Sequence, residues 1–200
     1  AEAPASWTPP DFWHELATDK PIVHVTQGTI ANDAPELIAP TLEALADLDV
    51  LVIVSTGNKP IASMGLGQLP ANARIATFLS YPELLPRTSV MVTNGGYGGV
   101  QIALSHGVPC VVAGTTEDKP EVAARVAWAG AGIDLETSTP TPAQVRAAVL
   151  RLLEEPSFRE NARRIAADYA RHDSVAEAIA VIEGATTMSR KTPVDAAEAE

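Results

Sequence analysis

The chain has 200 residues, 46% of them hydrophobic, and carries a formal net charge of −11 at pH 7. Its size and apolar content suit one well-packed domain, or one half of a two-domain protein. The acidic balance argues against nucleic acid or an anionic membrane as a partner, because both bind basic protein surfaces. An anionic ligand would therefore have to be held by local donors.

Targeting features and cysteine content favour a cytoplasmic protein. No apolar run approaches the roughly 20 residues that a transmembrane segment needs. Residues 1–20 lack the basic and apolar parts of a signal peptide. The single cysteine, Cys110, excludes an internal disulfide and fits a reducing compartment. It lies in an apolar run, where we expect a buried small side chain rather than a nucleophile.

Apolar, β-branched runs alternate along the chain with segments of helical spacing. In chain order the predicted elements are a short helix (10–17), a strand (21–27), a helix (34–48), two strands (49–56 and 73–78), a short helical turn (81–88), a strand (89–94), a helix (97–107), a strand (108–114), a helix (118–130), a strand (131–135) and two or three helices (141–155, 157–171 and 174–183). Thr141 and Pro142 are typical of an N-cap and a first helical position.

This alternation predicts an α/β fold of the Rossmann-like kind, a doubly wound parallel sheet with helices on both faces. If the strand order is the common 3-2-1-4-5-6, the first and fourth strands are neighbours, and a ligand crevice lies between the loops that follow them. Those loops are 27–32 and 94–99, and both are marked by glycine.

The second of these loops, "NGGYGG" at 94–99, leads from a strand into a helix. The start of a helix attracts phosphate, and glycines let phosphate oxygens approach the backbone closely. We expect the amides near Gly98, Gly99 and Val100 to face such a ligand, with the Asn94 side-chain NH2 beside them. Thr29, after Gly28, could add a hydroxyl from the opposite wall. The alternative is that these glycines only permit a tight turn and close packing of helix on sheet.

Other nucleotide sites fit this loop less well. It is not GxGxxG, it does not follow the first strand, and no P-loop lysine accompanies it. Both NAD binding and P-loop hydrolysis are therefore disfavoured. His24 lies within a predicted strand, where a satisfied core or crevice-wall side chain is the simpler interpretation. The other histidines are scattered without the spacing of a metal site.

Residues 78–135, from "FLSYPELLP" through "NGGYGGVQIALSHGVPCVVAG" to "TEDKPEVAARV" and "GAGIDL", resemble the donor-binding signature of UDP-glycosyltransferase-like enzymes of the GT-B fold. In that family a C-terminal Rossmann-like domain binds the nucleotide sugar, and an N-terminal domain binds the acceptor and supplies the catalytic base. The resemblance implies a nucleotide-sugar-binding domain at 20–184, a linker at 1–19 from a missing N-terminal domain, and a flexible acidic tail at 185–200.

The resemblance also assigns roles to single residues. Phe78 stands where the family has a Trp that stacks on the nucleobase, and the Leu79 backbone would lie at the base edge. Phe78 could equally be a core residue at a strand end. Asn94 replaces a His that contacts the phosphates, and Gly99 replaces a common Ser or Thr. Ile102 replaces a Glu that often holds the ribose hydroxyls, which leaves open whether the donor contains ribose or deoxyribose.

Three charged residues, Glu117, Asp118 and Lys119, fall at the family's Asp–Gln pair, which contacts sugar hydroxyls. Asp118 is the better candidate, because a carboxylate accepts from two adjacent hydroxyls. A solvated helix start with acids in its first turn explains these residues equally well. The complete predicted donor-binding set is Gly28, Thr29, Phe78, Leu79, Asn94, Gly95, Gly96, Gly98, Gly99, Val100, Glu117, Asp118 and Lys119.

The resulting hypothesis is the donor half of an inverting glycosyltransferase that transfers a hexosyl group to a small-molecule or lipid-like acceptor. It would bind a UDP- or dTDP-sugar without a metal and hold no catalytic residue, and the isolated domain would bind nucleotide without turnover. The alternatives are a sugar-nucleotide epimerase of the same fold and a non-catalytic interaction module.

Overall fold

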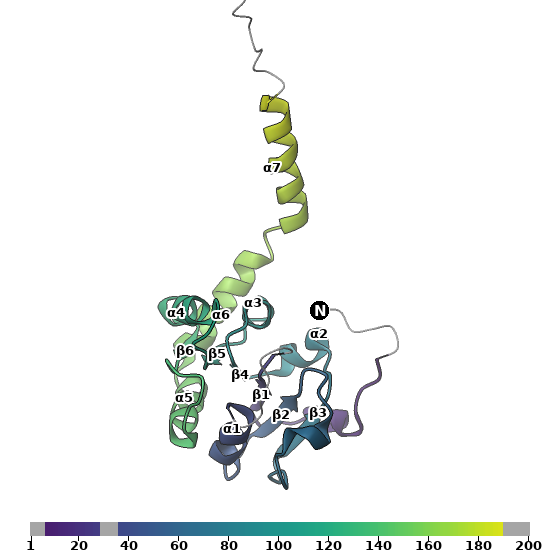
Figure 1. The fold of residues 1–200 in the computed structure, drawn as a ribbon, viewed down its shortest axis with the longest axis vertical. Helices are drawn as coiled ribbons and strands as arrows, with labels where there is room; N and C mark the ends of the chain where they lie inside the picture. The colour runs from purple at the N-terminus through teal and green to yellow at the C-terminus, as the bar shows by residue number, and fades with distance from the viewer. Residues whose placement is uncertain (1–6, 29–35, 190–200) are drawn as a thin grey trace, which may run out of the picture.

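A computed structural model describes residues 7–28 and 36–189 of the chain. Its centre is a sheet of six strands in the order β3-β2-β1-β4-β5-β6, and every neighbouring pair is parallel (Figure 1). The strands are β1 (Ile22–Thr26), β2 (Leu51–Ser55), β3 (Ala73–Ala76), β4 (Val90–Thr93), β5 (Cys110–Val112) and β6 (Gly132–Asp134). The predicted order is confirmed, and with it the adjacency of the first and fourth strands.

Helices cover both faces of this sheet, as predicted. The helices are α1 (Ile38–Leu45), α2 (Tyr81–Leu84), α3 (Tyr97–Ser105), α4 (Lys119–Trp128), α5 (Pro142–Glu154), α6 (Pro156–Tyr169) and α7 (Ser174–Ser189), with short 3-10 helices η1 (Asp11–Leu16), η2 (Ile61–Met64) and η3 (Leu85–Arg87). α1 and α5 share one core with the sheet, whereas α3, α4 and α6 share another. η1 and α2 close a third core beside β1 and β2.

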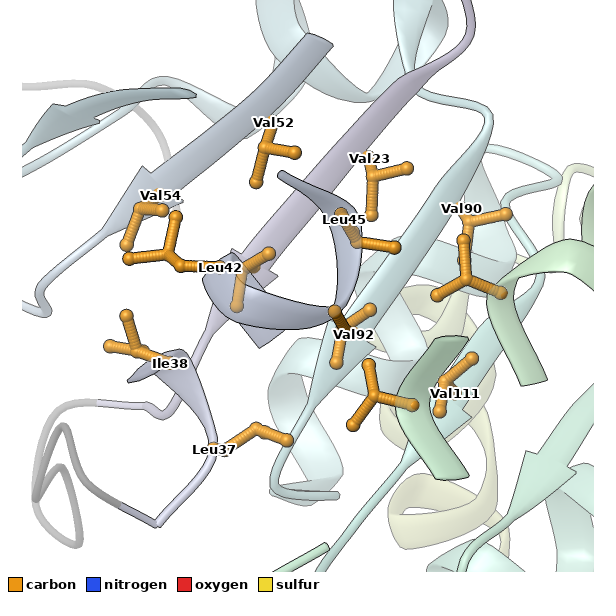
Figure 2. Packing of buried hydrophobic residues seen from close by; sticks show 14 of the residues in the cluster. Val23, Leu37, Ile38, Leu42, Leu45, Val52, Val54, Val90, Val92 and Val111 are labelled. Atoms are coloured by element: carbon orange, nitrogen blue, oxygen red, sulfur yellow. The ribbon is translucent and has the colours of Figure 1, made fainter. Parts of the chain in front are cut away.

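Successive strand residues point to opposite faces, so each strand feeds two cores. Val90 and Val92 of β4 lie in the core with α1, and Met91 between them lies in the core with α3. Figure 2 shows α1 packed over the sheet, with Leu42 and Leu45 directed at the valines of the strands. Strands that are apolar on both faces explain why the sequence shows continuous apolar runs rather than strict alternation.

Element ends agree with the predictions where local chemistry fixes them. Thr141 caps α5 in a capping box with Gln144, and Pro142 occupies the first helical position. α1 begins at Ile38, later than predicted, with Pro40 in its first turn, where no intrahelical N–H is needed. The predicted helical residues 34 and 35 lie outside the described part of the chain.

The N-terminal segment is more than the linker predicted for residues 1–19. Leu16 of η1 is only 3% exposed and packs against Ile22 and Leu84 in the core beside β1 and β2. Both carboxylate oxygens of Glu15 accept from the Arg74 guanidinium, at 2.6 and 2.7 Å. Residues 11–16 are therefore part of the domain, because the sheet face there has no other helix to cover it.

The last helix, α7, extends away from the rest of the domain (Figure 1). It runs to Ser189, past the predicted end at residue 183 and into the predicted tail. Among the described residues, no helix is both long and apolar enough to cross a membrane.

Candidate functional site

A cavity of about 420 Å³ lies at the carboxyl edge of the sheet. It is bounded by the segments that follow β1, β2, β3 and β4 and by the start of α4. The predicted residues that line it are Gly28, Phe78, Leu79, Asn94, Gly96, Gly98, Gly99, Glu117, Asp118 and Lys119. Gly95 and Val100 are buried behind its wall, and Thr29 lies outside the described residues.

The β4–α3 turn uses its glycines in different ways. Gly95 has φ +84°, and a Cβ there would lie 2.7 Å from Val112 Cγ1, so packing requires a glycine. At Gly98 φ is ordinary, and a Cβ would meet no atom within 4 Å. Turn formation and packing therefore explain Gly95 but not Gly98, which lines the cavity.

The amide expected at Val100 is a correction. Its N–H already donates to the Gly96 carbonyl oxygen at 3.2 Å, because the fourth residue of a helix makes the first intrahelical bond. Val100 is also 1% exposed. The donors at the cavity are therefore the earlier amides of the first turn, which belong to Tyr97, Gly98 and Gly99.

Asn94 links the two loops that flank the cavity. Its side-chain NH2 donates to the Gln27 carbonyl oxygen at 2.6 Å, and its Oδ1 accepts from the Gly96 N–H at 3.3 Å. One side chain thus fixes the end of β1 to the start of α3. A direct bond from Asn94 to a phosphate stays a prediction.

The start of α4 brings three charged side chains to another wall. Lys119 is 6% exposed, and its ammonium contacts Glu117 and lies 3.3 Å from Thr116 Oγ1. Glu117 has φ +59°, a conformation that costs energy in a residue with a side chain. Asp118 occupies the N-cap position without a side-chain capping bond, so its carboxylate is not used by the helix. This disfavours the interpretation of Asp118 as a simple cap.

Several lining residues were not predicted. Gly57 and Asn58 follow β2 and form the wall near Phe78, and the Asn58 N–H donates to the Thr77 carbonyl oxygen at 2.9 Å. Asn58 has φ +72°. The sequence signal was present, since "TGN" after a predicted strand places a third glycine-marked loop at the same edge.

The floor of the cavity is formed by Thr26, Ser55 and Tyr81. His24 lies behind Tyr81 and is 0% exposed, and burial lowers its pKa to about 4. It is thus a satisfied core residue, as one of the two interpretations expected. Ile102 also lines the cavity, whereas Gln101 accepts a hydrogen bond from the Tyr169 hydroxyl.

Metal ligands and nucleophiles are not gathered in the described residues. No group of three His, Cys, Asp or Glu side chains there is placed to hold a metal ion. Cys110 is buried in β5, and burial raises the pKa of its thiol to about 12. The prediction of an inert core cysteine is confirmed.

Comparison with protein families gives one match over most of the chain. The model of the erythromycin biosynthesis protein CIII-like, C-terminal domain matches residues 39–184. The chain is 50% identical over 182 residues to 4'-demethylrebeccamycin synthase of Lentzea aerocolonigenes, covering 91% of this chain and 42% of that protein. It is 41% identical to UDP-glucosyltransferase A1 of Starmerella bombicola, covering 84% and 37%.

Solved structures give the same picture. The glycosyltransferase VinC, solved in complex with dTDP, superposes with a TM-score of 0.73 at 31% identity, over 86% of this chain and 43% of that one. The calicheamicin glycosyltransferase CalG4 superposes with a TM-score of 0.75 at 27% identity, over 96% and 48%. The chain spans less than half the length of each of these proteins.

Proposed function

The chain belongs to the family of erythromycin biosynthesis protein CIII-like C-terminal domains, and from this membership we propose that it is the donor-binding half of an inverting glycosyltransferase. The whole enzyme transfers a hexosyl group from a nucleoside diphosphate to a small-molecule or lipid-like acceptor. An N-terminal domain of the same polypeptide binds the acceptor and supplies the base. The relatives reported above are glycosyltransferases by name, which favours transfer over the epimerase alternative.

One observation carries the proposal: the first turn of α3 opens onto an empty cavity at a glycine that packing does not require. The amides of the first turn carry the partial positive charge of the helix start, which suits a diphosphate. A cavity of about 420 Å³ is also of the size that holds small ligands. A non-catalytic module would have no need to keep this space open.

The cavity walls suggest how the donor lies. The diphosphate sits at the start of α3, and the nucleobase lies against Phe78 beyond β3. The sugar reaches the start of α4, where the Asp118 carboxylate accepts from its hydroxyls. UDP and dTDP are the nucleotides of choice, since VinC was solved with dTDP and several relatives are named UDP-glucosyltransferases.

In the reaction the bond between the sugar and the diphosphate oxygen breaks, and negative charge grows on that oxygen. The fixed amides of Tyr97, Gly98 and Gly99 stabilise this charge, and donors aimed at a developing charge are effective because they need no reorganisation. The Lys119 ammonium adds positive charge near the same place. The acceptor oxygen attacks from the opposite side of the sugar, which gives inversion, and no metal is needed.

Calorimetric titration of the 200-residue chain with UDP, dTDP, GDP and inorganic pyrophosphate tests the proposal. We expect UDP or dTDP to bind. Phe78→Ala should weaken the preferred nucleotide by roughly tenfold or more, since stacking on a base is worth about 1–3 kcal/mol, and leave pyrophosphate unchanged. Absence of binding by every nucleotide and by pyrophosphate would contradict a donor site. The predicted cytoplasmic location stays a prediction.

A further inference from the structure

A hydrogen-bonded chain of side chains runs beneath the cavity, and its direction can be derived from one end. His24 Nδ1 lies 2.9 Å from the Ile53 carbonyl oxygen. A carbonyl oxygen can only accept, so Nδ1 carries the proton of the neutral imidazole and Nε2 is left as an acceptor. Nε2 faces the Tyr81 hydroxyl at 3.5 Å, and the two rings meet edge to face.

The polarity passes from His24 to the cavity floor through Tyr81. The Tyr81 hydroxyl donates its single proton to His24 Nε2, because no other donor reaches that buried nitrogen among the described residues. Tyr81 also hydrogen-bonds to the side chains of Thr26 and Ser55. With its own proton engaged, the Tyr81 oxygen must accept in both of these bonds.

Thr26 and Ser55 therefore spend their hydroxyl protons on Tyr81 and present only lone pairs to other neighbours. The Gly28 N–H agrees with this, since it donates to Thr26 Oγ1 at 3.4 Å. Both residues line the cavity, yet they are only 4% and 5% exposed. The cavity floor is thus a pair of acceptors whose direction is set from behind.

The position of this pair in the sheet indicates which part of a ligand lies above it. Thr26 and Ser55 are register partners at the ends of β1 and β2. Along the same edge, β4 and the start of α3 lie on one side, and β3 with Phe78 lies on the other. Neighbouring strands are about 4.8 Å apart, so a nucleoside diphosphate laid along this edge places its pentose over β1 and β2.

We propose that Thr26 and Ser55 accept hydrogen bonds from the pentose hydroxyls of a nucleoside diphosphate, with Tyr81 and His24 as the residues that orient them. The inference rests on the proposed function, because it assumes the diphosphate at α3. It assigns recognition of the pentose to the cavity floor, where Ile102 on the facing helix contributes no polar atom.

Binding of UDP and of 2',3'-dideoxy-UDP to the 200-residue chain tests this assignment, with inorganic pyrophosphate as the reference ligand. We expect the wild type to prefer UDP, and Ser55→Ala to weaken UDP by roughly three- to tenfold, the value of one hydrogen bond. Dideoxy-UDP and pyrophosphate should bind as before. Tyr81→Phe should act in the same direction. Ser105→Ala and Tyr169→Phe make the same chemical changes outside the cavity and should change nothing.

The outcomes separate the two proposals. If UDP and pyrophosphate bind but the preference for UDP survives in Ser55→Ala, the assignment of the floor is overturned and the donor site stands. If neither ligand binds the wild type, the donor site fails and the assignment fails with it. Nitrogen NMR of the ligand-free chain gives an independent readout, in which His24 should be protonated on Nδ1. Its Nε2 resonance should move in Tyr81→Phe, and a proton on Nε2 would refute the polarity.

Discussion

Alanine at Gly98 should stabilise the fold and weaken the ligand at the same time. A Cβ at this position meets no atom within 4 Å, and φ there is one that any residue adopts. Replacing such a glycine by alanine raises the free energy of unfolding by roughly 0.4–1 kcal/mol, since the unfolded chain loses conformational freedom. For a domain of this size the melting temperature should rise by about 1–4 °C.

The same methyl group projects into open space where a diphosphate oxygen would meet the first-turn amides. Loss of one hydrogen bond to a charged group costs about 1.5–3 kcal/mol, so the dissociation constant for UDP should rise about ten- to a hundredfold. Differential scanning fluorimetry and calorimetry measure the two effects on one sample. Gly184→Ala is the matched control, because that glycine also faces open space but lies in α7. UDP binding by Gly98→Ala at wild-type strength would refute the reasoning.

Three further variants or conditions test the structure itself. Gly95→Ala should lower the free energy of unfolding by roughly 2–5 kcal/mol, from a left-handed φ and a clash with Val112, and a urea midpoint near that of the wild type would contradict this. Burial depresses the pKa of His24 from 6.5 to about 4, so the unfolded chain takes up a proton in that range that the folded chain refuses. Stability should therefore fall as the pH drops, by about 2 kcal/mol between pH 7 and pH 5, and His24→Asn should flatten this slope in urea titrations at the two pH values. Arg159 donates to three backbone carbonyl oxygens beside β4 and α3, so Arg159→Met should cost roughly 2–4 kcal/mol, whereas Arg164→Met on the exposed face of the same helix should cost little.

The sheet order could be predicted because strand patterns and their spacing along the chain constrain it strongly. Runs such as 49–56 and 89–94 are apolar on both faces, which is typical of central parallel strands. Once the order is known, the loops after the first and fourth strands must face one another. Glycine, asparagine and aromatic residues in those loops then mark the cavity, and the structure places Gly28, Asn94 and Phe78 at its walls.

Other features depend on distances that a sequence does not contain. The engagement of the Val100 amide follows from where α3 starts, and a shift of one residue would have freed it. The link from Asn94 to Gln27 joins residues far apart in the chain. The floor formed by Thr26, Ser55 and Tyr81 comes from three separate elements, each of which reads as an ordinary strand end or turn on its own.

The packing of η1 on the sheet has a practical consequence for engineering. Chimeric glycosyltransferases made by exchanging donor halves need a crossover point, and the sequence pattern alone would put it near residue 20. A junction there would discard Leu16 and the Glu15 partner of Arg74, leaving Ile22 and Leu84 uncovered in the recipient protein. Splicing upstream of Trp7 carries this small cover along with the sheet that it protects.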